Sequence, residues 1–390
     1  MTDGPVSLIE CRDYDPKQID AALSQLLAPL GGMKAFVRPG ERILIKPNLL
    51  MGMPPERAVS THPEIIRAVA AEVLRAGGRP VIADSPGGIT RPGQLDHVYR
   101  ISGMAEAARR ASLEGEGEVV LDRGGKNGEH FFPEGRIIRT APVIRAFLDA
   151  DRVINVCKLK THVMMHLTGA VKNLFGVVAG RAKVDFHLRF RNYDIFAGAL
   201  LDISQMVHPV LNIMDAVVGM EGMGPSNGKP RQTGFLLASP DACALDLAAA
   251  YLVGMRPEEV PTLRVAHDRG LAPMDPSRLR IVGGSLKDHV VKDYKKPARI
   301  FQVEGYDRYL PGFMKGLLRF VQPRPAVYRQ NCRKCGDCVR SCPPQAMDMG
   351  KQGPDIRYDA CIRCYCCQEL CKYDAIRIHQ PVLARRILRR

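Results

Sequence analysis

Nine of the twelve cysteines in this 390-residue chain lie between Cys332 and Cys371, and eight of those nine follow a regular spacing. The spacing is C-x-x-C-x-x-C-x-x-x-C, and it occurs twice, about 29 residues apart: Cys332, Cys335, Cys338 and Cys342, then Cys361, Cys364, Cys367 and Cys371. Three thiolates on one tight loop can occupy three corners of an iron–sulfur cube, and a fourth that follows a turn can reach a second cube. The spacing therefore predicts iron–sulfur binding.

Zinc is the alternative metal for closely spaced cysteines. A structural zinc site uses four ligands, usually arranged as two pairs separated by a longer spacer. A third cysteine at the same three-residue step has no place in such a site, and this favours iron and sulfur. Cys366 stands outside the repeated spacing, and we interpret it as a spectator thiol.

Over residues 328–380 the chain resembles the bacterial ferredoxins with two [4Fe-4S] clusters. Pro343 follows the first copy of the motif, whereas Lys372 stands at the equivalent place in the second. The resemblance implies that the fourth cysteine of each copy belongs to the other cluster. The implied ligand sets are Cys332, Cys335, Cys338 and Cys371 for one [4Fe-4S] cluster, and Cys361, Cys364, Cys367 and Cys342 for the other.

The larger N-terminal part alternates short apolar runs with helical patterns. Strands are expected at 42–45, 80–83, 118–121, 152–156, 210–214, 234–238 and 279–282, and helices at 63–76, 167–175, 193–207 and 241–253. Continuously apolar strands that alternate with helices are typical of a mainly parallel sheet with helices on both faces. The predicted fold class is therefore α/β, followed by a small α+β ferredoxin-like domain.

Polar side chains follow several of these strands. They are Lys46 and Asn48 after 42–45, Asp84 after 80–83, Lys158, Lys160 and His162 after 152–156, and Asp215 after 210–214. Ligands of such sheets bind at the carboxyl ends of the strands, where these residues would meet.

Residues 157–187 add more basic side chains between glycines, with no acidic residue before Asp185. They include Lys172, Asn173, Arg181, Lys183 and His187, and a helix is expected to begin near His166. Lysines, histidines and exposed backbone amides suit a carboxylate or a phosphate. We expect one site for an anionic substrate, lined by Lys46, Asn48, Asp84, Lys158, Lys160, His162, Lys172, Asn173 and Asp215, with Lys160, His162 and His187 as candidates for catalysis.

The alternative interpretation is a structural ion-pair network, in which Asp84 and Asp215 neutralise the lysines. A second glycine-rich segment, 219–231, fits neither a Walker loop nor a dinucleotide fingerprint, because Met223 and Asn227 replace required glycines and Pro230 follows Lys229. We interpret it as a mobile lid or a substrate loop.

Four segments resemble the family named domain of unknown function 362. They are KPNLL at 46–50, ADSPGG at 83–88, KLKTH with LTGAVKNLFGVVAGRAK over 158–183, and DAVVGMEGMGP at 215–225. The resemblance covers residues 5–285, and family members often carry a C-terminal ferredoxin module. It implies an iron–sulfur protein with a redox role.

The expected organisation is an α/β domain at 1–314, a linker at 315–327, a ferredoxin domain at 328–380 and a basic tail at 381–390. The net charge is +15, and the segment from Lys315 onward holds 16 Lys and Arg against 6 Asp and Glu. No apolar stretch of membrane-spanning length and no secretory signal is recognised, and disulfides are rare in the cytoplasm, so a cytoplasmic protein with reduced cysteines is expected.

The favoured function is an iron–sulfur oxidoreductase or redox accessory protein that acts on an anionic small molecule or on the cofactor of a redox partner. One alternative is a ferredoxin-like electron carrier whose α/β domain is a docking scaffold. Another is a non-redox acid/base enzyme with structural clusters. The segment 309–321 could form an amphipathic helix for peripheral membrane contact, and no nucleic-acid module is recognised.

Overall fold

The computed structural model describes residues 4–87, 93–180, 182–297 and 322–381. Arg181, the segment 309–321 and the basic tail from Arg385 to Arg390, which the sequence analysis singled out, lie outside the described residues. Among the described residues, no helix is both long enough and apolar enough to cross a membrane.

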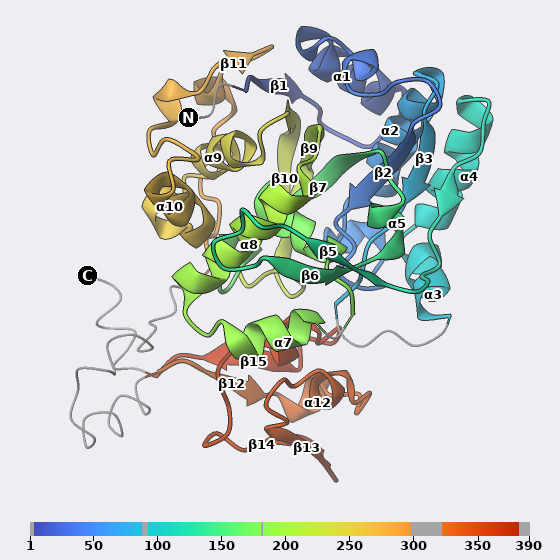
Figure 1. Cartoon of the computed structure of the whole chain (residues 1–390). Coiled ribbons are helices and arrows are strands. Elements are labelled where there is room, and N and C mark those ends of the chain that lie inside the picture. Colours follow the sequence, from blue (N-terminus) through green and yellow to red (C-terminus); the bar gives the residue numbers. More distant parts are fainter. Residues whose placement is uncertain (1–3, 88–92, 181, 298–321, 382–390) are drawn as a thin grey trace.

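A sheet of nine described strands forms the centre of the larger domain (Figure 1). The strand order is β11-β1-β10-β9-β7-β2-β3-β4, with β8 paired to β7 off this path. Neighbouring strands are parallel except where β10 pairs with β9 and β1, and where β8 pairs with β7. The strands are β1 (Val6–Glu10), β2 (Arg42–Pro47), β3 (Arg79–Ile82), β4 (Val120–Leu121), β7 (Arg152–His162), β8 (His166–Leu167), β9 (Leu211–Glu221), β10 (Lys229–Ser239) and β11 (Ile281–Val282).

Helices cover both faces of this sheet, as the alternation of buried residues requires. In β2, Ile43 and Ile45 pack into one core with α1, α2 and α4, whereas Leu44 packs on the opposite side with α8. A third core lies between α9 and strands β1, β7, β9 and β10. The helices are α1 (Pro16–Leu27), α2 (Pro63–Arg75), α3 (Gln94–Ile101), α4 (Met104–Glu114), α5 (Arg145–Leu148), α6 (Gly169–Asn173), α7 (Ala182–Arg189), α8 (Tyr193–Val207), α9 (Ala242–Leu252) and α10 (Pro261–Asp268). The predicted fold class is confirmed.

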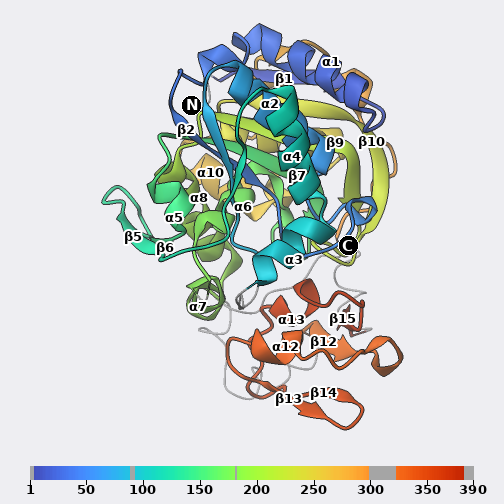
Figure 2. The same ribbon diagram turned by 90° about the vertical axis from the view of Figure 1, so that its right-hand side faces the viewer.

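The small C-terminal domain lies below the α/β domain in two perpendicular views (Figures 1 and 2). It contains two antiparallel strand pairs and two short helices. The elements are β12 (Arg324–Val327), α12 (Asp337–Arg340), β13 (Met347–Gly350), β14 (Gly353–Ile356), α13 (Cys366–Glu369) and β15 (Ile376–His379).

Three elements differ from the sequence prediction in ways that move site residues. Strand β7 continues to His162, so Lys158, Lys160 and His162 lie in a buried strand and not in a loop after it. The strand extends because β9 is equally long and supplies Asp215 opposite Lys158. The expected helix at 167–175 begins later, at Gly169, because His166 and Leu167 pair with β7 as strand β8.

The glycine-rich segment 219–231, which the sequence analysis interpreted as a mobile lid or a substrate loop, forms the end of a β-hairpin. Its two ends belong to β9 and β10, and the turn between them contacts the small domain. Ser226 Oγ donates to the Glu369 carbonyl oxygen at 2.6 Å, and Asn227 Nδ2 donates to that of Gln368 at 2.9 Å. The turn therefore joins the two domains. The hairpin of β5 (Gly128–Phe131) and β6 (Thr140–Val143) was not predicted.

Candidate functional site

The cysteines of the small domain gather as the ferredoxin resemblance implies. Cys332, Cys335, Cys338 and Cys371 line one cavity, although Cys371 follows Cys338, the nearest of the other three in the sequence, by 33 positions. Burial, together with the neighbouring thiols of Cys335, Cys371 and Cys332, raises the pKa of Cys338 to about 12.

The other four cysteines also lie near one another. Burial raises the pKa of Cys342, and the thiols of Cys364 and Cys361 raise it further. Burial and the thiols of Cys364, Cys361, Cys338 and Cys342 raise the pKa of Cys367. Iron binds the thiolate form of cysteine, and binding keeps the thiols deprotonated although burial raises their pKa values. Both groups of four cysteines therefore suit an iron–sulfur cluster.

Backbone geometry repeats with the cysteines. Lys334, Gly336 and Gln345 have left-handed φ values of 52°, 80° and 51°. The residues 29 positions later, Arg363, Tyr365 and Asp374, have φ values of 53°, 58° and 51°.

These turns direct backbone amides at sulfur. The Ala346 amide, which follows Gln345, donates to Cys342 Sγ at 3.2 Å. The Ala375 amide, which follows Asp374, donates to Cys371 Sγ at the same distance. Amide donors around thiolates are a property that tunes iron–sulfur clusters, so the backbone fits such a cofactor as well as the cysteines do.

The two repeats differ in what surrounds them. In the first repeat, Asp337 and Arg340 form an ion pair at the surface. Their counterparts in the second repeat, Cys366 and Glu369, are 6% and 7% exposed. Tyr365 is 1% exposed and packs into the core shared with α8. The second repeat is thus the one that docks on the α/β domain.

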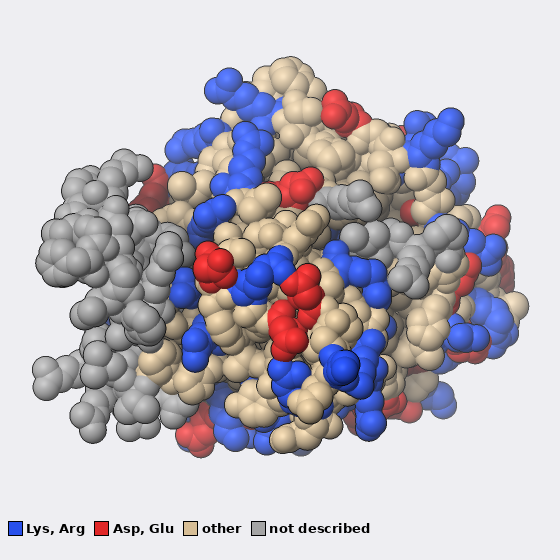
Figure 3. All heavy atoms as spheres, turned by 90° about the horizontal axis from the view of Figure 1, so that it is seen from below, with Lys and Arg blue, Asp and Glu red and all other residues tan. Residues whose placement is uncertain are grey.

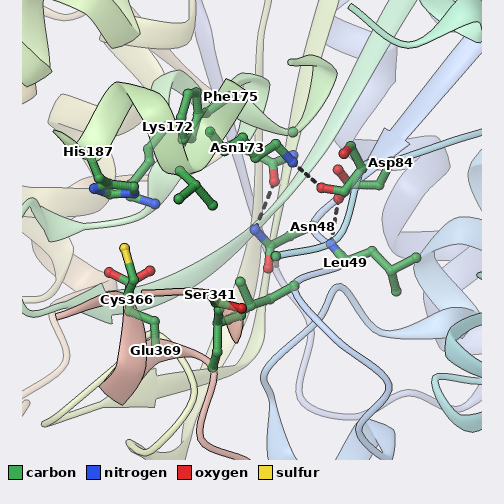
Figure 4. A pocket seen from close by; sticks show the side chains of 17 residues that line it. Asn48, Leu49, Asp84, Lys172, Asn173, Phe175, His187, Ser341, Cys366 and Glu369 are labelled. Carbon is green, nitrogen blue, oxygen red and sulfur yellow. Dashed lines mark hydrogen bonds between the residues drawn. The ribbon is translucent and has the colours of Figure 1, made fainter. Parts of the chain in front are cut away.

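A pocket with a volume of about 100 Å³ lies between this docked repeat and the carboxyl edge of the sheet (Figure 4). The carboxyl ends of β2 and β3, helices α6 and α7, and helix α13 contribute to its walls. Its lining residues are Asn48, Leu49, Leu50, Asp84, Ser85, Gly87, Lys172, Asn173, Phe175, Gly176, Lys183, Val184, His187, Ser341, Cys366, Glu369 and Leu370.

Figure 4 shows Lys172 and His187 on one side of the pocket and Cys366 and Glu369 on the other. Lys172 has no hydrogen-bond or ion-pair partner among the described residues, and burial lowers its pKa. His187 is 8% exposed, and its Nδ1 has no hydrogen-bond partner within the described part of the chain. Burial lowers the pKa of His187 to about 4, so its ring is neutral at pH 7.

A further polar wall, formed by Asn48 and Asp84, is fixed by hydrogen bonds among residues that follow β2 and β3 and a residue of helix α6. Asn48 Nδ2 donates to Asn173 Oδ1 at 2.8 Å, and the Leu49 amide donates to Asp84 Oδ2 at 2.8 Å. Asp84 Oδ2 also lies 3.0 Å from Lys46 Nζ. Gly176 permits this pair, since a Cβ there would lie 2.2 Å from Asp84 Oδ1 and 2.4 Å from Lys46 Nζ.

Five of the sequence-predicted residues therefore line the pocket: Asn48, Asp84, Lys172, Asn173 and His187. Lys46 lies behind it, paired with Asp84. Lys158 pairs with Asp215 at 2.8 Å in a separate buried group, where the Tyr14 hydroxyl donates to Asp215 Oδ1 at 2.8 Å. The structure does not bring these two residues into the pocket.

Lys160 and His162 are also buried outside the pocket lining. Lys160 Nζ donates to the carbonyl oxygens of Val59 at 2.7 Å and Pro225 at 3.3 Å, and burial strongly lowers its pKa. His162 Nε2 lies 2.9 Å from Glu369 Oε1, while its Nδ1 accepts backbone amides. Both groups hold β7, the hairpin turn and α13 together.

Sequence reasoning missed Glu369, Ser341 and Cys366 as pocket residues. The sequence contains features that single out two of these positions. Glu369 is the sole acidic residue between Cys361 and Cys371, and Cys366 is the cysteine outside the repeated spacing. Their role depends on docking of the second repeat, which no local pattern encodes.

The paired cysteine groups, the amides directed at sulfur and the α/β domain define an iron–sulfur protein with a sheet-edge pocket. Residues 43–251 match the domain of unknown function (DUF362), and residues 331–375 match the 4Fe-4S dicluster domain. The chain belongs to the DUF362 family, and the resemblance stated from its sequence is confirmed.

One relative is the "Thylakoid-associated protein sll1697" of Synechocystis sp., which is 34% identical over 328 residues. The match covers 83% of this chain and 98% of that protein. Among solved structures, the lactate racemase apoprotein from Thermoanaerobacterium thermosaccharolyticum matches with a TM-score of 0.40 and 13% identity. That match covers 65% of this chain and 58% of the racemase chain.

Proposed function

We propose that this protein is an iron–sulfur oxidoreductase, or a redox accessory protein, whose clusters exchange electrons with a small anionic molecule held in the pocket. Two [4Fe-4S] clusters would be held by the two cysteine groups, one by Cys332, Cys335, Cys338 and Cys371 and the other by Cys342, Cys361, Cys364 and Cys367. When bound, such clusters supply one-electron transfer.

One observation carries this proposal: the same short helix serves the pocket and the second cysteine group. Helix α13 begins at Cys366, which lines the pocket, and continues with Cys367, which belongs to that group. A molecule in the pocket would contact the residue next to a cluster ligand, so substrate and cluster would lie close together.

The charges around the pocket support an anion. Lys46 and Asp84 neutralise each other, whereas Lys172 has no partner among the described residues. Glu369 is ionised, because His162, Lys172 and His187 lower its pKa to about 2 although burial alone would raise it. Glu369 Oε1 lies 2.9 Å from His162 Nε2 and forms no ion pair with Lys172 among the described residues, although the charges of Glu369 and Lys172 lie close enough to affect each other's pKa.

The outer surface gives little support for a function in binding nucleic acid or another extended acidic partner. Seen from the side of the small domain, Lys and Arg alternate with Asp and Glu (Figure 3). Ion pairs in the small domain include Arg329 with Asp355 and Arg377 with Asp374. A mixed surface favours no extended acidic partner such as nucleic acid. The cytoplasmic location expected from the sequence stays a prediction.

The test is an electron paramagnetic resonance (EPR) spectrum of the anaerobically reconstituted, dithionite-reduced protein, recorded with and without acetate as the probe. An oxidoreductase with an anion pocket beside one cluster should show an acetate-dependent change in that cluster's signal. A plain electron carrier should show none. Clusters that dithionite does not reduce would favour the non-redox alternative.

A further inference from the structure

The polar atoms without partners in the pocket specify more than negative charge. Besides Glu369 Oε1, which lies 2.9 Å from His162 Nε2, three atoms of buried lining side chains have no hydrogen-bond partner among the described residues: Asn48 Oδ1, Asp84 Oδ1 and His187 Nδ1. A buried polar atom without a partner is costly, and native proteins keep such atoms mostly where a ligand or water satisfies them.

Two of these atoms can only accept a hydrogen bond. Asp84 uses Oδ2 for the Leu49 amide and for Lys46, and this leaves Oδ1 as an acceptor. Asn48 donates through Nδ2 to Asn173, and this assigns Oδ1 as its remaining acceptor. A simple anion without hydrogen-bond donors would leave both oxygens unsatisfied and would also repel Asp84.

The wall formed by Lys172 and His187 offers hydrogen-bond donors and positive charge. Lys172 supplies an ammonium group without a described partner, and His187 supplies a ring nitrogen beside it. Phe175 and Phe196 hold the His187 ring, with centroid distances of 6.2 and 4.7 Å. A carboxylate suits Lys172, and a hydrogen-bond donor suits the acceptors on the β2 and β3 side.

The volume limits the size of such a ligand. An apolar cavity of about 150 Å³ is known to hold benzene, and one water occupies about 30 Å³ in the liquid. The pocket volume of about 100 Å³ therefore suits a molecule smaller than benzene. Nucleotides and sugar phosphates are too large for this space.

We propose that the pocket binds a small carboxylate with an O–H or N–H donor on the adjacent carbon, which is the class of 2-hydroxy and 2-amino acids. The carboxylate contacts Lys172. An ammonium group can donate to both Asn48 Oδ1 and Asp84 Oδ1, whereas a hydroxyl, with its single hydrogen, donates to one of them. This inference rests on the proposed function, since it names the substrate class of the same pocket.

The experiment compares three probes by isothermal titration calorimetry on the reconstituted full chain: acetate, which has no such donor, glycolate, which has a hydroxyl, and glycine, which has an ammonium group. Glycolate, glycine or both should bind at least about tenfold more tightly than acetate, because each donor hydrogen bond to a charged or buried acceptor contributes that much. The stronger of the two identifies the donor. Equal affinity of all three probes would overturn the proposal.

Variants assign the contacts. Lys172→Met should weaken every probe about tenfold or more, whereas Asn48→Ala should reduce the advantage of the preferred probe over acetate. Lys17→Met, at an exposed lysine on α1, is the matched control and should bind like the wild type. The comparison of probes on the wild type needs no variant, so it tests the proposal even if a variant fails to fold.

The substrate class and the redox proposal fail in different ways. If glycolate or glycine binds preferentially but leaves the EPR signal of both clusters unchanged, the substrate class stands and the redox function falls. If acetate changes the EPR signal and binds as tightly as the other probes, the redox function stands and the substrate class falls.

Discussion

His162 Nε2 lies 2.9 Å from Glu369 Oε1, and this contact joins the central strand of the sheet to the helix of the second cysteine repeat. The two residues are 207 positions apart in the sequence. Burial lowers the pKa of His162 to about 4, whereas its proximity helps to keep Glu369 ionised. The contact helps to hold α13 over the sheet edge, where Cys366 and Glu369 line the pocket, so the position of the small domain depends on residues of the α/β domain.

The two cysteine groups predict the metal content of variants. Anaerobically reconstituted wild type should contain about eight irons per chain, because each cubic cluster holds about four. Cys338→Ser should lose about four irons or convert one cluster, while Cys366→Ser, which changes a pocket residue, should keep about eight. Iron and sulfide analysis measures both. Equal losses in the two variants, or zinc in place of iron, would show that the ligand assignment is wrong.

Gly169→Ala should destabilise the protein by about 3 kcal/mol and displace helix α6. Gly169 has a φ of +58°, and a Cβ there would lie 2.2 Å from Asp246 Oδ1. The Asp246 carboxylate accepts the Ala170 amide through Oδ1 at 2.5 Å and the Val171 amide through Oδ2 at 3.1 Å. Chemical denaturation measures the loss. Gly40→Ala is the control, because Gly40 has a φ of +82° with no atom near its Cβ, and should cost only about 1 kcal/mol. Equal losses would remove the steric argument.

His187 predicts a pH dependence of stability. Its pKa in the folded state is about 4, below the ordinary value of 6.5, so the unfolded state binds more protons between these two values. Stability should therefore fall as the pH drops through this window, by about 1 kcal/mol for this residue between about pH 7 and about pH 5.5. Asp246, whose pKa burial raises to about 7, acts in the opposite direction.

A comparison of variants isolates the share of His187. His187→Phe should flatten the dependence of the unfolding free energy on pH by that amount. Phe190→Leu changes the packing of the same helix without removing a titrating group, and should keep the wild-type slope. A His187→Phe slope that equals the wild-type slope would contradict a neutral, buried His187.

The α/β domain should fold without the cluster domain. Three hydrophobic cores lie in this domain, and the small domain adds Tyr365 to one of them. A fragment of residues 1–314 is expected to be soluble and to unfold cooperatively, as calorimetry would show. Tyr365→Ala in the full chain removes the same contact and should cost about 3 kcal/mol. An insoluble or non-cooperative fragment would mean that the small domain is integral to the core.

The sequence predicts the cluster segment and the fold class well, because cysteine spacing and strand periodicity are local. The structure brings Asn48 and Asp84 into one pocket because carboxyl ends of parallel strands share one edge, and helices α6 and α7 add Lys172, Asn173 and His187. Their role in binding stays a prediction.

The sequence does not predict the length of β7, which depends on pairing with β9. The alternative interpretation, in which Asp84 and Asp215 neutralise lysines, anticipates the pairs Lys46–Asp84 and Lys158–Asp215. Which lysine pairs with which aspartate depends on the register of the strands, and the sequence does not predict it.

The central claim is that the pocket and one cluster are electrostatically coupled, and a redox titration of both clusters followed by EPR tests it most directly. Lys172→Met removes a positive charge beside Cys366, so it should lower the midpoint potential of one cluster by roughly tens of millivolts and leave the other unchanged. Lys17→Met should leave both potentials at the wild-type values. If Lys172→Met also leaves both potentials unchanged, the pocket is not coupled to a cluster and the account is contradicted.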